Sequence, residues 1–267
     1  TSSTRRKRMS SPVLRYYEMG HGVTAFSSTR HGGCGKGTYG SFNVNKYCGD
    51  EPAAVAENRR MLCAELGIGT DNLVVPHQTH GTAVRRIAAG FVSLSADMRD
   101  MLLEGVDAVM TDVKGMCVGV STADCIPILL YDARHGACCA VHAGWRGTVA
   151  RIVERAVDEM AAHYGTQAEM LTVVIGPGIS QEAFEVGDEV YEAFDREGFT
   201  MGRIARRYDK WHIDLWECNR IQLISKGVNP DKIFIDGTCT YKNCGEFFSA
   251  RRLGTGSGRI FTGIMMK

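Results

Sequence analysis

The sequence lacks any run of eighteen apolar residues, which excludes a conventional transmembrane helix. Its first residues also lack the apolar stretch of a secretory signal peptide. The ten cysteines include no CxxC pair, so neither a zinc ribbon nor a thioredoxin-type redox site is supported. Several cysteines lie inside apolar runs such as residues 136–141. This placement favours buried free thiols and the reducing cytoplasm over a disulfide framework.

The sequence has little excess of charge of either sign. It carries 31 basic and 30 acidic residues, and four of the basic residues stand together at positions 5–8. A nucleic-acid-binding surface is expected to be basic, so the charge gives no support for a nucleic-acid partner. We expect residues 1–8 to be a disordered leader or a cloning remnant, and residues 9–267 to form a single catalytic domain.

The sequence does contain a mixture of helix and strand patterns. Apolar spacing predicts helices over residues 51–66, 148–164, 188–194 and 215–226, with Asp50 and Asp188 as candidate N-caps and Gly67 just past the first helix. Short β-type segments are predicted at 22–27, 72–75, 82–87, 107–110, 116–121, 126–131, 137–141, 171–175 and 232–235. Strict βαβ alternation is absent. We therefore expect an α/β (α+β) fold, a layered sandwich with a central mixed β-sheet flanked by helices.

Three segments, 76–81, 121–125 and 141–147, place a histidine or cysteine at the end of a predicted strand. A catalytic zinc needs three protein ligands and an open position, and His80, Cys125 and His142 supply an accepted set. His77 competes with His80, and single residues of these types are more often structural. The same residues fit a second interpretation, in which Cys125 is a nucleophile and His142 its base, as in a cysteine hydrolase or transferase. Spacing alone leaves both open.

Several arginines stand in glycine-rich loops, where their donor fork suits phosphate or carboxylate groups. Arg146 follows His142 closely and Arg251 follows a Phe-Phe-Ser-Ala run, which separates these two from ordinary surface charges. Asp124 either orients a metal ligand or makes a turn before the next strand. The other arginines of this kind are Arg30, Arg252 and Arg259.

Four motifs stand in a recognisable order: His-Gln-Thr-His-Gly at 77–81, Gly-Val-Asp-Ala at 105–108, Thr-Ala-Asp-Cys at 122–125 and His-Ala-Gly-Trp-Arg-Gly at 142–147. With weaker matches such as Ser-Phe-Asn at 41–43, they resemble the laccase-domain family. That family was once described as multicopper polyphenol oxidoreductases and is now regarded as purine nucleoside phosphorylases. The resemblance runs from about Thr24 to the C-terminus. Residues 180–184 lack the cysteine pair that the family often carries there, and the loop at 251–258 lacks an aspartate.

The resemblance implies a Zn²⁺ ion bound by His80, Cys125 and His142, with purine nucleosides and phosphate as substrates. The implied reactions are phosphorolysis of adenosine, inosine, guanosine and methylthioadenosine, and deamination of adenosine to inosine. Copper is disfavoured because the eight histidines form none of the His-x-His pairs that a laccase needs. Editing of cell-wall precursors, a role of some family members, remains an alternative. Our candidates for substrate binding are Arg30, Asn43, Asp124, Arg146 and Arg251.

Overall fold

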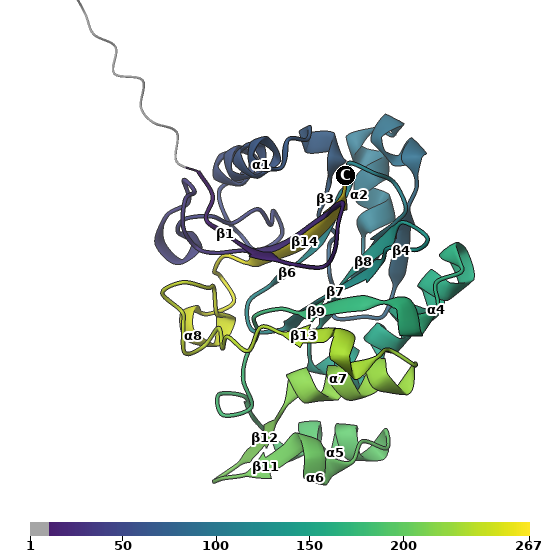
Figure 1. The fold of residues 1–267 in the computed structure, drawn as a ribbon. Helices are drawn as coiled ribbons and strands as arrows, with labels where there is room; N and C mark the ends of the chain where they lie inside the picture. Colours follow the sequence, from purple (N-terminus) through teal and green to yellow (C-terminus); the bar gives the residue numbers. More distant parts are fainter. Residues whose placement is uncertain (1–10) are drawn as a thin grey trace, which may run out of the picture.

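Two large mixed β-sheets form the centre of the molecule in the computed structural model, which describes residues 11–267 (Figure 1). The five-stranded sheet runs, in spatial order, β1 (Leu14–Tyr17), β2 (Val23–Ser28), β14 (Ile260–Met266), β6 (Cys117–Thr122) and β3 (Leu73–Val74). The six-stranded sheet runs β13 (Ile233–Ile235), β9 (Thr172–Ile175), β7 (Ile126–Asp132), β8 (Ala137–Ala143), β5 (Ala108–Thr111) and β4 (Val84–Ile87). A small antiparallel sheet contains β10 (Glu185–Val186), β12 (Trp211–Ile213) and β11 (Ala205–Arg207). The leader expected at residues 1–8 lies outside the described residues.

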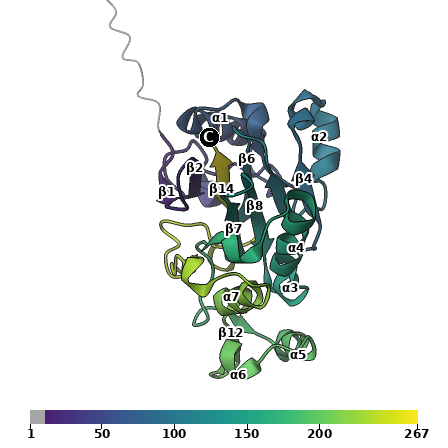
Figure 2. The ribbon, with the colours of Figure 1, turned by 45° about the vertical axis from the view of Figure 1, so that its right-hand side comes forward.

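Helices cover the outer faces of the two large sheets (Figure 2). Helix α1 (Pro52–Leu66) packs on the five-stranded sheet, whereas α4 (Ile152–Tyr164) and α7 (Leu215–Ser225) pack on the six-stranded sheet. The remaining helices are α2 (Ala96–Leu103), α3 (Trp145–Val149), α5 (Asp188–Arg196), α6 (Met201–Ile204) and α8 (Ala250–Leu253). This helix–sheet–sheet–helix arrangement confirms the layered α/β class. Within residues 11–267, no helix combines the length and apolar composition that crossing a membrane requires.

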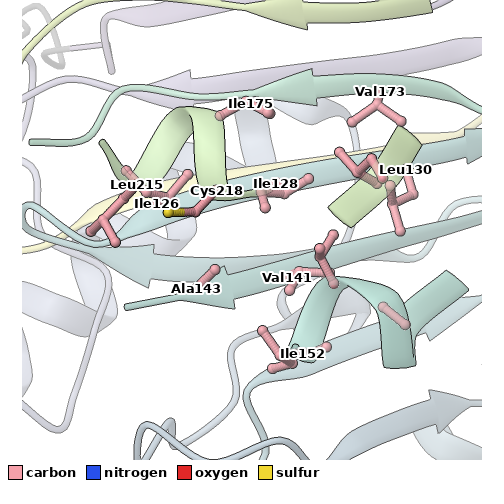
Figure 3. Packing of buried hydrophobic residues seen from close by; sticks show 14 of the residues in the cluster. Ile126, Ile128, Leu130, Val141, Ala143, Ile152, Val173, Ile175, Leu215 and Cys218 are labelled. Carbon is pink, nitrogen blue, oxygen red and sulfur yellow. The ribbon is translucent and has the colours of Figure 1, made fainter. Parts of the chain in front are cut away.

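Strands β7 and β8 separate the two main parts of the core. Because successive side chains of a strand point to opposite faces, Ile128 and Val141 face the helices, whereas Leu129 and Ala140 face the other sheet. Figure 3 shows the helix-side cluster, with Ile152 of α4 beside Val141. Each fully buried Leu, Ile or Val side chain contributes about 1.5–3 kcal/mol relative to exposure. The alternation along β8 also puts His142 on the face between the sheets.

The helix predicted over residues 148–164 is two helices in the structure. Helices α3 and α4 meet at Arg151, whose backbone adopts a left-handed conformation with φ of 62°. The Arg151 guanidinium donates to the Glu154 carboxylate and to the carbonyl of Glu197, which holds the break in place. The apolar spacing continues through the break, so the sequence predicts one helix where the structure has two.

The predicted helix caps are displaced by one residue. Glu51, not Asp50, is the N-cap of α1, and Asp50 instead accepts a hydrogen bond from the Glu51 N–H. Gly187 is the N-cap of α5, so Asp188 is the first helical residue. Gly67 ends α1 with a φ of 72°, as predicted for a glycine in the left-handed region.

Candidate metal centre

Three side chains that the sequence singled out converge at one end of the two sheets. The candidate ligand atoms of His80, Cys125 and His142 all lie within 4.8 Å of one another. Cys125 Sγ is 4.0 Å from His80 Nε2, and the two imidazole rings meet edge to face at 4.9 Å. His142 is buried, Cys125 is half-buried and His80 is exposed, so the cluster is accessible from one side.

The donor set fits one tetrahedral metal ion. Bonds of about 2.0–2.3 Å to nitrogen and sulfur would place neighbouring ligand atoms about 3.5 Å apart. The observed separations, up to 4.8 Å, are somewhat wider, and small side-chain movements would close the difference. Three protein ligands with one accessible side leave the open position that distinguishes a catalytic metal site from a structural one.

Asp107 organises the cluster, although the sequence analysis gave it no role. Its carboxylate lies 2.7 Å from His142 Nδ1 and accepts hydrogen bonds from the backbone N–H groups of Thr79, His80 and Gly81. The Nδ1 bond fixes the imidazole tautomer that leaves Nε2 free to bind a metal. The backbone bonds hold His80 in a left-handed conformation, with φ of 63°. One buried carboxylate therefore positions both histidines.

Burial and mutual charge shift the pKa values of this group of residues. Burial alone would raise the pKa of Cys125, but the neighbouring His142 and His80 outweigh it and lower that pKa to about 6. Burial alone would lower the pKa of His142, but Cys125 and Asp107 raise it to about 9. Burial would likewise raise the pKa of Asp107, yet the bonds from His142 and the backbone lower it. These shifts favour the thiolate of Cys125 and the imidazolium of His142 when no metal is bound.

His77 lies near the cluster but is not part of it. Its Nδ1 is 2.7 Å from the Glu104 carboxylate, and its ring stacks on Tyr47 with centroids 4.1 Å apart. These contacts occupy one ring nitrogen and one face of the ring. Of the two histidines in the 77–81 motif, the structure therefore brings His80 to the cluster.

The cluster lies in a cleft of about 270 Å³. Two hydroxyl groups in its lining, those of Ser121 and Thr122, are buried without a hydrogen-bond partner. Arg259 provides a cation, and carbonyls of residues 255, 257 and 258 hold its guanidinium. Apart from the cluster, these three and His77, the lining contains Asn45, Tyr47, Cys48, Gln78, Ala123, Ala250 and Thr255. The segments 76–81 and 121–125 singled out in the sequence contain His77, Gln78, Ser121, Thr122 and Ala123, and Arg259 was one of the candidate arginines. The sequence analysis missed the loop that carries Asn45, Tyr47 and Cys48, because loop residues carry no periodic signal.

None of the five residues proposed to bind substrate lines this cleft. Arg30 donates to two backbone carbonyls of neighbouring loops. The guanidinium of Arg146 is exposed and lies 4.4 Å from the centre of the Trp145 ring. Arg251 donates to the carbonyl of Glu185. Direct contact of these arginines with a substrate stays a prediction.

The other two candidates hold loops that border the cleft. Asn43 is fully buried, and its side-chain oxygen accepts the backbone N–H of Arg259. Asp124 accepts the Ser249 hydroxyl and the backbone N–H of Arg251, so it fixes the start of α8. Both residues therefore position cleft-lining segments.

Comparisons with known proteins agree with this architecture. The family model described as multi-copper polyphenol oxidoreductase laccase matches residues 24–267. A protein from Bacteroides thetaiotaomicron named purine nucleoside phosphorylase is 47% identical over 91% of this chain and 92% of its own. A protein from an unknown prokaryotic organism, named adenosine deaminase RL5, is 43% identical over 92% of this chain and 95% of its own.

A solved structure also shares the fold. The hypothetical protein YfiH of Bacillus licheniformis superposes with a TM-score of 0.90 at 26% sequence identity. The match covers 97% of this chain and 98% of that one. The arrangement of sheets and helices described above is therefore that of an experimentally determined relative.

Proposed function

The chain belongs to the multi-copper polyphenol oxidoreductase laccase family, and we propose that it is a zinc-dependent purine nucleoside phosphorylase that also deaminates adenosine. Two relatives with high identity over nearly the whole chain carry these two names. The observation that carries the proposal is the cluster of His80, Cys125 and His142 in a cleft. The cleft is lined mainly by polar side chains, with Tyr47, Ala123 and Ala250 as its aromatic and apolar part, so it offers many hydrogen-bonding groups to a polar ligand such as a nucleoside.

In this proposal His80, Cys125 and His142 hold the zinc ion. When bound, zinc would act as a Lewis acid that makes water a nucleophile at neutral pH, which is the chemistry that deamination of a purine requires. Asp107 keeps the His142 tautomer and the His80 backbone in the ligating arrangement. A zinc-bound Cys125 would remain a thiolate, which its lowered pKa favours.

Phosphorolysis needs an anion next to the sugar, and Arg259 supplies fixed positive charge in the cleft. The hydroxyls of Ser121 and Thr122 are buried without partners, so they are donors that a phosphate or ribose oxygen would satisfy. In the proposed mechanism Asn43 and Asp124 act through the loops that they hold. We retain three arginines as candidates that would reach substrate only after the segments that carry them move: Arg30 in a loop, Arg146 in α3 and Arg251 in α8.

The direct test is incubation of the purified protein with adenosine, with and without phosphate. We expect adenine and ribose 1-phosphate only with phosphate, and inosine in both samples. Cys125→Ala should lose zinc and both activities. The control Cys34→Ala removes an exposed thiol outside the cleft and should retain them. If no product exceeds the Cys125→Ala background, the proposal fails.

A second function is favoured by one observation, the chain of contacts from Cys125 to His142 to Asp107. A thiolate of lowered pKa, a histidine and an orienting carboxylate are the parts of a cysteine hydrolase. Chelation distinguishes the two functions, because a nucleophile–base pair works without metal. Full activity in zinc-free protein would favour the hydrolase.

Two broader expectations also remain proposals. The residues that line the cleft span positions 45–259, which supports a single catalytic domain over residues 9–267. All ten cysteines are free, which supports the reducing cytoplasm as the compartment. Fractionation of the native organism would test the second, and recovery of the protein among secreted proteins would refute it.

A further inference from the structure

A second cavity, of about 200 Å³, lies between helices α1 and α2 and outside the cleft. Both helices lie at the same end of the molecule in Figures 1 and 2. Leu73, Val75, Phe91 and Leu103 form its apolar part, and Arg59 of α1 also lines it. Lys46 faces this cavity, whereas its neighbours in sequence, Asn45 and Tyr47, line the cleft. The loop around Lys46 thus separates the two spaces.

Arg59 is an arginine whose charge has no ionic partner among the described residues. Its Nε donates to the carbonyl of Val44 at 2.8 Å, but its Nη2 is buried and has no hydrogen-bond partner. Burial lowers the pKa of Arg59, an effect that the nearby Tyr47 and Asp100 only partly oppose. Because a guanidinium stays protonated in proteins, Arg59 keeps a poorly compensated positive charge.

The other charges that line the cavity already form pairs. Lys46 Nζ lies 2.8 Å from the Asp100 carboxylate, and Arg99 Nη1 lies 2.8 Å from the Asp71 carboxylate. Both pairs are partly exposed, whereas the Nη2 of Arg59 is inaccessible to solvent. Three cations therefore face two carboxylates, and the unbalanced charge is that of Arg59.

We propose that this cavity binds a small oxyanion, a phosphate or a carboxylate, through the guanidinium of Arg59. A planar guanidinium donates in parallel to two oxygens of such a group. The orphaned Nη2 is buried in this structure, so the Arg59 side chain would turn toward the cavity to reach the ligand. The cavity, of about 200 Å³, is smaller than the cleft of about 270 Å³, so we infer a ligand smaller than a nucleoside. This anion site is separate from the cleft, and the proposal does not depend on the function that we propose for the cleft.

Crystals soaked in selenate test the location of the site, because selenium scatters anomalously. We expect an anomalous peak within hydrogen-bond distance of Arg59 in the wild-type protein and in Arg60→Met, and none in Arg59→Met. Arg60 is the matched control because it is the next residue of α1, is exposed and pairs with Glu57. Selenate in the cleft without selenate at Arg59 would overturn the proposal.

Thermal unfolding in phosphate and in acetate tests affinity and ligand class in solution. Stabilisation by the preferred anion should need at least tenfold more anion in Arg59→Met than in Arg60→Met. Arg59→Lys, which keeps the charge but loses the fork, serves if Arg59→Met does not fold, and it should also bind more weakly. A stronger response to phosphate or to acetate identifies the oxyanion. Equal responses of the Arg59 and Arg60 variants would refute the site.

Discussion

Replacing Asp107 by asparagine should weaken metal binding without touching a ligand. The two side chains have the same shape, but only one terminal atom of asparagine accepts hydrogen bonds. In the wild-type protein one carboxylate oxygen accepts the N–H groups of Thr79 and Gly81, and the other serves His80 N–H and His142 Nδ1. An amide –NH₂ in the second position would donate to His142 Nδ1. It would thereby favour the tautomer that carries its proton on the metal-facing nitrogen.

The size of the effect follows from what this contact does. Loss of a carboxylate that orients a ligating histidine typically costs 10–100-fold in metal affinity. That range corresponds to about 1.4–2.8 kcal/mol of binding free energy. The amide –NH₂ would also face the N–H of His80 and could not accept its hydrogen bond, so the loop that carries His80 would loosen. We therefore expect a loss of zinc affinity of about 100-fold.

A competition titration with a chromophoric chelator measures the change in zinc affinity. Asp132→Asn is the matched control, because Asp132 is also fully buried and accepts from a histidine, His135 Nδ1, at 2.8 Å. It lies at the opposite end of β7 from Cys125. We expect the control to lose folding stability but to retain wild-type zinc affinity. Asp107→Asn with wild-type affinity would refute the role assigned to Asp107.

Three further outcomes are expected. In Gly144→Ala the new Cβ would lie 3.0 Å from Cys125 Sγ and 3.2 Å from His80 Cδ2, so the folded protein should hold less zinc by elemental analysis. In zinc-free protein, the rate of Cys125 alkylation by iodoacetamide should rise with pH and reach half its maximum at about pH 6, the pKa of this thiol. A half-maximal rate at about pH 8.5, the pKa of an ordinary cysteine, would contradict a stabilised thiolate. The pKa of Asp132 is lower in the folded protein than in the unfolded chain, where it is about 3.9. The Asp132 carboxylate therefore stabilises the fold at pH values above about 3.9, and this stabilisation is lost as the pH falls through the pKa of the folded state. In urea unfolding, Asp132→Asn should therefore be about 1–3 kcal/mol less stable than wild type at pH 7, with the difference shrinking near pH 3.

The strands that could be predicted from the sequence are those with a local signal. Each of the nine predicted segments falls on an observed strand, because short apolar runs bounded by turns describe β-structure well. Strand β14 was missed, although it lies in the middle of the five-stranded sheet. Thr262 and Gly263 interrupt its apolar run, and its partners β2 and β6 lie more than 130 residues earlier. Pairing over such distances leaves no local pattern.

The candidate ligands could be predicted because each stands at a strand end within a distinctive motif. Asp107 stands in the 105–108 motif, but the sequence analysis gave it no role, because an aspartate before a strand is usually a turn residue and only the fold brings it to His142. The loop that carries Asn45 and Tyr47 was missed for a related reason. Its role in the cleft depends on contacts with distant segments, such as the stacking of Tyr47 on His77.

The position of the cluster follows from how the chain passes between the sheets. His80 lies between β3 of the five-stranded sheet and β4 of the six-stranded sheet, and Cys125 lies between β6 and β7, which again belong to different sheets. His142 is near the end of β8, on the face that looks toward the other sheet. Two ligands, His80 and Cys125, thus lie in segments that connect one sheet to the other, and the third, His142, lies on a strand next to these connections. Because the distance between the sheets is set by the core packed between them, that core also sets the spacing of the ligands.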